Sequence, residues 1–253
     1  MKIIPLSEGA FTVDKTKVFV PFEIGSDQLR DRPVGSLLVE VQPFLVITDQ
    51  DLLLLDTGLG FVNDNGVMQL HQLIMNAGIN PSEVTKVLMS HLHKDHSGGI
   101  CLKNNAGSAG ALAFPNADYY VQQKEFELAM SGTGSYKKED IACLQGSDRL
   151  KFMDGDGSIS GYIHYEVTAG HSPFHQVFRI DAGGRKIFFG GDDAPQLSQM
   201  RKRYIAKYDY DGKKCMELRQ EWWETGQQEG WSFLFYHDIK APVYPPSGDS
   251  GKR

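Results

Sequence analysis

The first ninety residues of the chain alternate apolar runs with short polar turns. Two runs, FLVIT (44–48) and DLLLLD (51–56), flank the turn-forming pair DQ, and this pattern predicts a buried β-hairpin. Next, VMQLHQLIMNAG (67–78) places its apolar residues on one helical face and predicts a helix that ends at Gly78. The run VTKVLMS (84–90) predicts a strand. The local order is therefore strand, helix, strand.

The second half of the chain repeats this alternation. FPNADYYVQQKEFELAM (114–130) predicts a strand that leads into a helix, and SGTGSYKKED (131–140) is a polar loop that suits a flexible lid or a surface insertion. The turn DAGGRK (181–186) separates two strands, and an amphipathic helix from residue 211 precedes the apolar strand WSFLFYH (231–237). We expect an α/β protein with two sheets faced by helices, built as one domain over residues 1–253.

One segment is rich in potential metal ligands. SHLHKDHSGG (90–99) follows a predicted strand and holds three of the eight histidines, with an aspartate between the last two. Chance would produce this pattern roughly six times in ten thousand sequences of this composition. His91, His93 and Asp95 alternate along what we expect to be an extended backbone, so they would point the same way without a helix, and His96 would begin the turn. Imidazole nitrogen and carboxylate oxygen are ligands that Zn²⁺ takes.

Three later segments offer the same ligand types at the ends of apolar runs. They contain His171 in TAGHSPFHQ, Asp192 in FFGGDD and His237 in FLFYHD. Taken singly each is weak, because a histidine after a strand is more often a hydrogen-bonded structural residue. Together with the 90–99 segment they predict one shared cleft. We interpret His71, His164 and His175 as structural or surface residues.

The motifs LLLLDTGLG, SHLHKDHSGG, AGHSPFH, FFGGD and FYHD, in this order, resemble those of the metallo-β-lactamase-fold hydrolases. The tail of the chain looks most like the lactonase and organophosphate-hydrolase-like branch. The resemblance implies a four-layer αββα sandwich with two divalent metals, zinc being expected and iron or manganese being alternatives. It would assign His91, His93 and His171 to one metal, Asp95, His96 and His237 to the other, and Asp192 to the bridge, with Asp193 as its rival. Asp56 would orient a ligand imidazole.

The same resemblance implies a reaction. A bridging hydroxide would attack the carbonyl of a lactone or another carboxylic ester, and Asp95 would also shuttle a proton to the leaving alkoxide. Three positions depart from the pattern: Phe174 stands where relatives carry a small glycine, and Ala194 and Pro195 stand where lactonases can carry a tyrosine. We expect a bulkier pocket wall at Phe174, and Tyr204 or Tyr208 as the substitute tyrosine.

Net charge and cysteine content limit the expected binding partners, cysteine redox state and cellular location. The formal charge of −6 gives no footprint for nucleic acid or an anionic membrane, so we expect a small-molecule substrate; a homodimer is one assembly that the sequence leaves open. The basic run RKR (201–203) is either a solvated helix face or a site that attracts a small anion. Cys101, Cys143 and Cys215 are widely spaced and odd in number, which predicts reduced thiols. Without a signal peptide or membrane span in sight, we expect a cytoplasmic protein.

Several alternatives stay open at this stage. A phosphotriester hydrolase would use the same two metals, and a persulfide dioxygenase of this fold would hold a single iron with two histidines and one aspartate. A thioesterase of the glyoxalase II type would need a C-terminal extension that we do not find, and the acidic balance disfavours a nuclease. A metal-binding module without turnover is the alternative outside the enzymes. Metal analysis would separate these classes.

Overall fold

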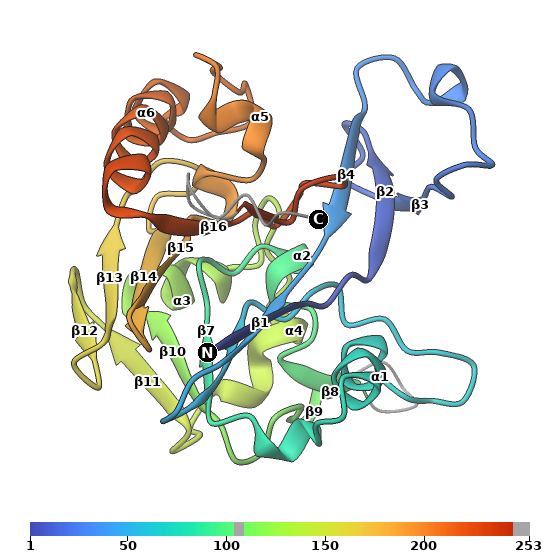
Figure 1. Ribbon diagram of the computed structural model, residues 1–253. Coiled ribbons are helices and arrows are strands. Elements are labelled where there is room, and N and C mark those ends of the chain that lie inside the picture. The colour runs from blue at the N-terminus through green and yellow to red at the C-terminus, as the bar shows by residue number, and fades with distance from the viewer. Residues whose placement is uncertain (104–108, 245–253) are drawn as a thin grey trace.

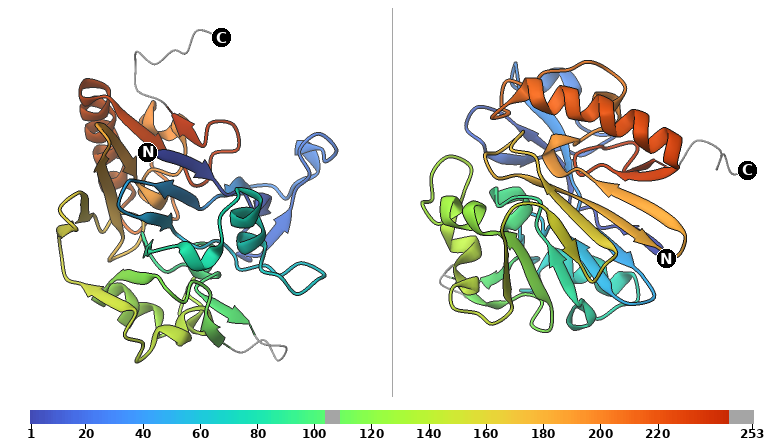
Figure 2. Two further views of the ribbon diagram at one scale, coloured as in Figure 1. Left: turned by 60° about the horizontal axis from the view of Figure 1, so that its bottom comes forward. Right: turned by 90° about the vertical axis from the view of Figure 1, so that its left-hand side faces the viewer.

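A computed structural model describes residues 1–103 and 109–244 of the chain. Two six-stranded sheets lie face to face, and helices cover their outer faces (Figure 1). This is the four-layer αββα arrangement expected from the sequence, and the views in Figure 2 show the longest helix, α6, packed over the outer face of the second sheet. Among the described residues, no helix is both long enough and apolar enough to cross a membrane.

The first sheet is mixed. Its order is β1-β5-β6-β7-β10-β11: β1 and β5 pair antiparallel, as do β5 and β6, and the remaining pairs are parallel. The expected hairpin of FLVIT and DLLLLD is the β5–β6 pair and is confirmed. The strands are β1 Lys2–Pro5, β5 Phe44–Ile47, β6 Leu52–Leu55, β7 Lys86–Leu88, β10 Asp118–Gln122 and β11 Leu150–Met153.

The second sheet has the order β12-β13-β14-β15-β16-β17. All its pairs are antiparallel except β15 with β16. The expected turn DAGGRK joins β14 to β15, and Gly183 and Gly184 both adopt the positive φ that this tight turn needs. The strands are β12 Gly157–Ile159, β13 Ile163–Val167, β14 Gln176–Ala182, β15 Arg185–Phe189, β16 Trp231–Leu234 and β17 Val243–Tyr244.

Helices and two small sheets complete the fold. α1 ends as expected, with Gly78 at φ +83° directly after its last cap residue. The helices are α1 Gln69–Asn76, α2 Lys94–Ser97, α3 Gln123–Ala129, α4 Lys138–Ile141, α5 Leu197–Met200 and α6 Gly212–Glu229. The small sheets comprise β3-β2-β4 (Phe19–Pro21, Gly9–Val13, Leu37–Val41) and β8-β9 (Cys101–Lys103, Ala109–Leu112).

Three apolar clusters fill the three interfaces between the four layers. Side chains alternate along each central strand: Leu53 and Leu55 of β6 face the second sheet, whereas Leu54 faces the helices α1 and α3. On β15, Ile187 and Phe189 face the first sheet and Phe188 packs under α6. This two-residue period is what turns unbroken apolar runs such as DLLLLD into strands buried on both faces.

The expectation of reduced cysteines is wrong for two of the three. Cys101 on β8 and Cys143, in the 3-10 turn Ala142–Leu144, form a disulfide 42 positions apart in sequence, and Cys215 alone is free and buried. The spacing of these residues gave no sign of pairing, because the fold decides which cysteines meet. Strand β9 and the turn after α4 pack against β8 and bring the two thiols together.

The polar segment 131–140 is more ordered than a free loop. Its last residues belong to α4, and the carbonyl oxygen of Ser135 accepts a hydrogen bond from the backbone N–H of Lys94 at 3.1 Å. The ring of Tyr136 lies 4.7 Å from that of His93. The segment is therefore packed against the histidine-rich loop; its role as a lid stays a prediction.

Candidate metal centre

The candidate site lies where five strands end at one edge of the sandwich. β6 and β7 run parallel and lead to Asp56 and to the histidine-rich loop. In the second sheet, β13 and β15 both run antiparallel to β14, and β16 runs parallel to β15. These three strands therefore point the same way and deliver His171, Asp192 and His237 to one edge. This topology explains why ligands scattered over the sequence can meet.

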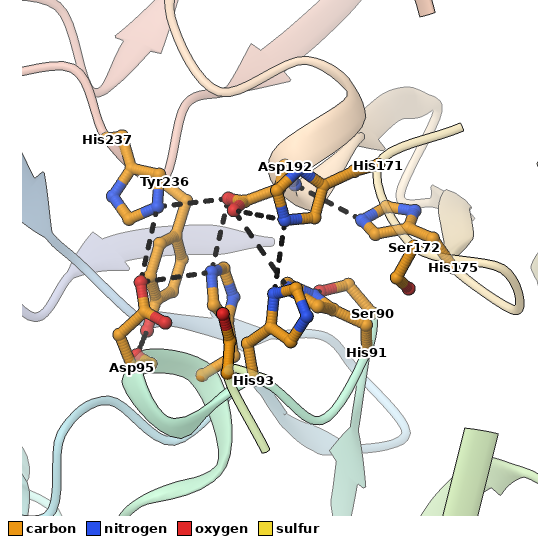
Figure 3. Close-up of polar contacts among 12 residues, drawn as sticks. Ser90, His91, His93, Asp95, His171, Ser172, His175, Asp192, Tyr236 and His237 are labelled. Carbon is orange, nitrogen blue, oxygen red and sulfur yellow. Dashed lines mark hydrogen bonds and ion pairs between the residues drawn. The ribbon is translucent and has the colours of Figure 1, made fainter. Parts of the chain in front are cut away.

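The structure brings the seven sequence-predicted ligands together, as Figure 3 shows. Within each of three groups, one candidate ligand atom per residue lies within 4.8 Å of the others. The groups are His91, His93 and His171; His91, His96 and Asp192; and Asp95, His96 and His237. Six of the seven side chains belong to buried residues, and His93 is partly exposed.

The local conformation of the histidine-rich loop differs from our expectation. Lys94–Ser97 form the short helix α2, so Asp95 does not continue the extended backbone after His93, and His96 lies in the helix instead of beginning the turn. Neighbouring side chains on a helix point about 100° apart, and this lets one short segment serve two ligand groups. The segment ends at Gly98 and Gly99, where there is no space for a side chain. A Cβ at Gly98 would lie 2.3 Å from the carbonyl oxygen of Leu59, and one at Gly99 would lie 2.2 Å from that of Thr57.

The carboxylate of Asp192 lies at the centre of the cluster. One of its oxygens is 3.1 Å from Nε2 of His96 and 3.0 Å from Nε2 of His237. The other is 3.2 Å from Nε2 of His171. Asp193 is turned away: one oxygen is 3.0 Å from Nδ1 of His175, and the other accepts the backbone N–H of His171. The geometry therefore favours Asp192 over Asp193 as the bridge.

Several imidazoles are held from behind by a polar partner. Nδ1 of His96 lies 2.7 Å from Asp56, Nδ1 of His171 lies 2.9 Å from Asp209, and Nδ1 of His237 lies 2.6 Å from the carbonyl oxygen of Glu40. Such partners fix the tautomer that leaves Nε2 free for a metal. The ring of His93 is the exception, since its Nδ1 faces Nε2 of His171 at 3.1 Å.

Asp56 is held in an unusual backbone conformation, with φ of +54°. Its carboxylate accepts hydrogen bonds from both the backbone N–H and the hydroxyl of Ser90, besides contacting His96. A left-handed aspartate costs conformational energy that the surrounding contacts must offset. The strand end after β6 is thus shaped to support the histidine-rich loop.

Burial and charge prepare His91, His93 and Asp192 for a cation, whereas the nearby carboxylates raise the pKa of His96, His171 and His237. Burial, reinforced by neighbouring imidazoles, lowers the pKa of His91 and His93 well below the usual range, so both rings carry free lone pairs. Burial opposes the charge of Asp192, yet the surrounding histidines hold its pKa well below that of an ordinary carboxyl. Neutral imidazole and ionised carboxylate are the forms that bind a metal.

The ligand atoms also lack well-directed hydrogen bonds of their own. Nε2 of His91, Nε2 of His96 and one carboxylate oxygen of Asp192 are buried without a hydrogen bond of good geometry among the described residues, although the last two lie 3.1 Å apart. Each buried polar atom left without a partner costs roughly 1–3 kcal/mol. Two divalent cations coordinated by nitrogen and oxygen, one at His91 and one at His96, with Asp192 between them, would satisfy these atoms, so the residues fit the metals that the resemblance implies.

Some supporting residues were not anticipated from the sequence. Asp209 behind His171 lies in the tail YDYDG, which shows no pattern of its own. Tyr236 stacks on His96 with ring centroids 4.0 Å apart, and its hydroxyl donates to the carbonyl oxygen of Asp95. His175, interpreted as structural, accepts the backbone N–H of Asp192. The ring of His175 also lies 5.0 Å from that of His91. Only the position of His175 in the AGHSPFH motif could have suggested this contact.

A cleft of about 780 Å³ opens onto the cluster. Its floor includes five of the seven ligands, namely His93, Asp95, His171, Asp192 and His237. Tyr204 and Tyr208 both line it, and the ring of Tyr208 lies 6.0 Å from that of His171. Phe174 is not among the described residues that line this cleft, so the expected bulkier wall is not found there.

The chain is similar in sequence to proteins of a known superfamily. Residues 38–222 match the family model of the metallo-beta-lactamase superfamily. An N-acyl homoserine lactonase from Bacillus thuringiensis is 28% identical over 226 residues, which cover 81% of this chain and 84% of that protein.

Two solved structures share the fold. The hydrolase AbOPH of the beta lactamase superfamily has a TM-score of 0.74 at 23% identity, with 98% of this chain and 90% of that chain covered. AidC, a dizinc quorum-quenching lactonase in complex with a product, has a TM-score of 0.71 at 20% identity, with 96% and 89% covered. The family model spans more than half of the chain and includes most of the strand ends that carry the cluster. The chain therefore belongs to the metallo-beta-lactamase superfamily.

Proposed function

We propose that the protein is a binuclear metal-dependent hydrolase that cleaves a lactone or another carboxylic ester. The observation that carries the proposal is the buried cluster of five imidazoles and two carboxylates at the floor of an open cleft. The similarity to N-acyl homoserine lactonases supports the lactone as the favoured substrate class.

The ligand groups suggest how two cations would be shared. His91, His93 and His171 would hold one, Asp95, His96 and His237 the other, and Asp192 would contact both. When bound, two zinc or similar divalent ions supply Lewis acidity that polarises a carbonyl oxygen and makes water nucleophilic near neutral pH. The second group favours a binuclear hydrolase over the single-iron dioxygenase, which needs only two histidines and one aspartate.

Asp95 is the residue we propose for proton transfer. It lines the cleft, and its carboxylate oxygen lies 3.5 Å from Nε2 of His237. The hydroxyl of Tyr236 holds its backbone from behind. A carboxylate placed between the nucleophilic water and the leaving alkoxide can take a proton from the first and deliver it to the second.

Tyr208 is the residue we propose for binding the substrate oxygen. It stands beside His171 at the floor, and burial raises the pKa of its hydroxyl above the ordinary value, so the group remains a hydrogen-bond donor. Tyr204 is the weaker choice. Both tyrosines are exposed to a similar degree, but Tyr208 lies beside the ring of His171, whereas Tyr204 contacts Arg219 through its backbone carbonyl oxygen.

A substrate panel tests the proposal. Metal-loaded protein is assayed with lactones, aryl esters, phosphotriesters and thioesters, alongside the variant His93→Ala, which removes one ligand from the partly exposed side of the cluster. We expect hydrolysis of lactones or esters and its loss in the variant. Unchanged turnover in the variant, or activity confined to phosphotriesters, would contradict the proposal.

Three further expectations belong to this proposal. We propose that residues 1–253 form one hydrolase domain, with a small-molecule substrate and without nucleic acid or membrane as partner. A homodimer remains a prediction. The cytoplasmic location also remains a prediction, and the Cys101–Cys143 disulfide weighs against it, because such bonds are rare in the reducing cytosol.

A further inference from the structure

The mouth of the cleft carries an unusual concentration of positive charge. Five basic side chains line it, and we call them the basic rim: Lys15, Lys17, Lys94, Lys202 and Arg203. Among the described residues that line the cleft, Asp14 is the one carboxylate outside the metal-ligand candidates. This contrasts with the formal charge of −6 for the whole sequence. The rim is therefore a local feature and not a consequence of a basic surface.

The basic rim comes from two opposite walls. Lys15 and Lys17 lie in the turn between β2 and β3, whereas Lys202 and Arg203 follow α5. Figure 1 shows the β3-β2-β4 sheet and the α5 segment on either side of the region above α2. Lys94 belongs to α2, between the ligands His93 and Asp95. A molecule in the cleft would thus have cations on both sides.

These charges form no close ion pair within the described chain. None of the five rim residues has a carboxylate oxygen within 4.0 Å there, while lysines elsewhere, such as Lys86 and Lys186, do form ion pairs. Lys17 donates to the hydroxyl of Ser135 at 2.9 Å, and Lys94 donates to the carbonyl oxygen of Lys17. Two of the cations are therefore held in place by neutral acceptors, which leave their charge available.

We propose that the substrate carries an anionic group, a carboxylate or a phosphate, which the basic rim binds while the ester or lactone carbonyl lies at the metal centre. Apolar residues, Phe19, Leu37, Val39 and Pro195 among them, line the same cleft. They fit an aliphatic spacer between the reacting carbonyl and the charged end. The inference rests on the proposed hydrolase function and specifies its substrate class.

Matched esters test the inference on zinc-loaded enzyme. Mono-4-nitrophenyl adipate ends in a carboxylate, and 4-nitrophenyl 6-methylheptanoate replaces that carboxylate with an isopropyl group of similar size. We expect a kcat/KM at least ~10-fold higher for the adipate, and a preference that shrinks as salt rises, because the screening length is only about 8 Å at 0.15 M ionic strength. A third ester that ends in a phosphate monoester tells which anion the rim prefers.

The metals also attract anions, so the contribution of the basic rim to the preference for the anionic ester must be measured separately. Charge reversal on one wall of the cleft does this. The variant Lys202→Glu/Arg203→Glu should lower the ratio of the two kcat/KM values by ~10-fold or more. The control Lys207→Glu changes an exposed lysine of the same loop outside the cleft and should leave the ratio unchanged. Lys202→Gln/Arg203→Gln gives the charge-removal version if the reversal lowers the melting temperature.

The outcomes distinguish the two proposals. If the zinc-loaded enzyme hydrolyses neither the esters nor lactones, the proposed function fails. If it hydrolyses the neutral ester as well as or better than both anionic esters, or if the rim variants leave the ratio unchanged, the inference about the basic rim is overturned and the hydrolase function stands.

Discussion

The floor and the rim of the cleft are built in opposite ways. The floor consists of metal-ligand candidates that are mostly buried, and several of their rings are fixed by a second polar contact. The basic rim consists mainly of exposed lysines and an arginine, on a hairpin turn and on the segment after α5. From this difference we expect the chemistry to depend on the preorganised floor, and substrate choice to depend on rim charges that can change without disturbing that floor.

Removing the central carboxylate should have the largest effect on the floor. Asp192→Ala takes away the group that lies nearest to three histidines, and we expect kcat/KM for a lactone or ester to fall by at least ~10³-fold, because metals supply several kcal/mol of transition-state stabilisation. Metal content should fall with it. The control Asp64→Ala changes an exposed aspartate in another loop. Equal activity in the two variants would show that the floor is not the reaction centre.

Loss of the disulfide should have the next largest effect, on stability. Cys101 lies five residues after His96, and its bond to Cys143 closes a loop of 42 positions. Chain entropy predicts a loss of about 4 kcal/mol in the free energy of unfolding for Cys101→Ser/Cys143→Ser. Denaturant unfolding with and without reductant measures it. Reductant should destabilise the wild type and leave the double variant unaffected; an insensitive wild type would mean that the bond does not form.

Weakening the support behind the floor should have a smaller effect. Asn tolerates the left-handed conformation of residue 56, so Asp56→Asn preserves the backbone while removing the charge that contacts His96. We expect a loss of about 10- to 100-fold in metal affinity or activity. Zinc titration followed by calorimetry measures the affinity. An unchanged affinity would assign Asp56 to folding alone.

The hydroxyl of Tyr208 should contribute least of these. Tyr208→Phe removes one donor beside His171, and we expect kcat/KM to fall by about tenfold, the value of one hydrogen bond. Tyr204→Phe is the matched control in the same cleft and should change kcat/KM less. If kcat/KM falls further in the Tyr204 variant than in the Tyr208 variant, Tyr204 and not Tyr208 binds the substrate oxygen.

The sequence predicted those parts of the site that depend on local patterns. The 90–99 motif and the strand ends before His171, Asp192 and His237 can be recognised in the sequence, because apolar runs mark the strands that precede these residues. The resemblance to a known family joined these segments into one cleft. The runs predicted two sheets faced by helices, the resemblance implied the four-layer sandwich, and this fold was confirmed.

Features that depend on distant contacts escaped the sequence. Asp209 meets His171 across 38 positions and Tyr236 meets Asp95 across 141, and no spacing rule announces either contact. The disulfide was missed for the same reason. The helix α2 was missed because four residues are too few to show a helical period.

The metal content of the purified protein tests the central claim most directly. Elemental analysis of the wild type, after equilibration with zinc and removal of unbound metal, should find about two divalent ions per chain, and fewer in Asp192→Ala. A wild type that binds no metal would contradict the account, and so would one that holds a single iron and consumes oxygen.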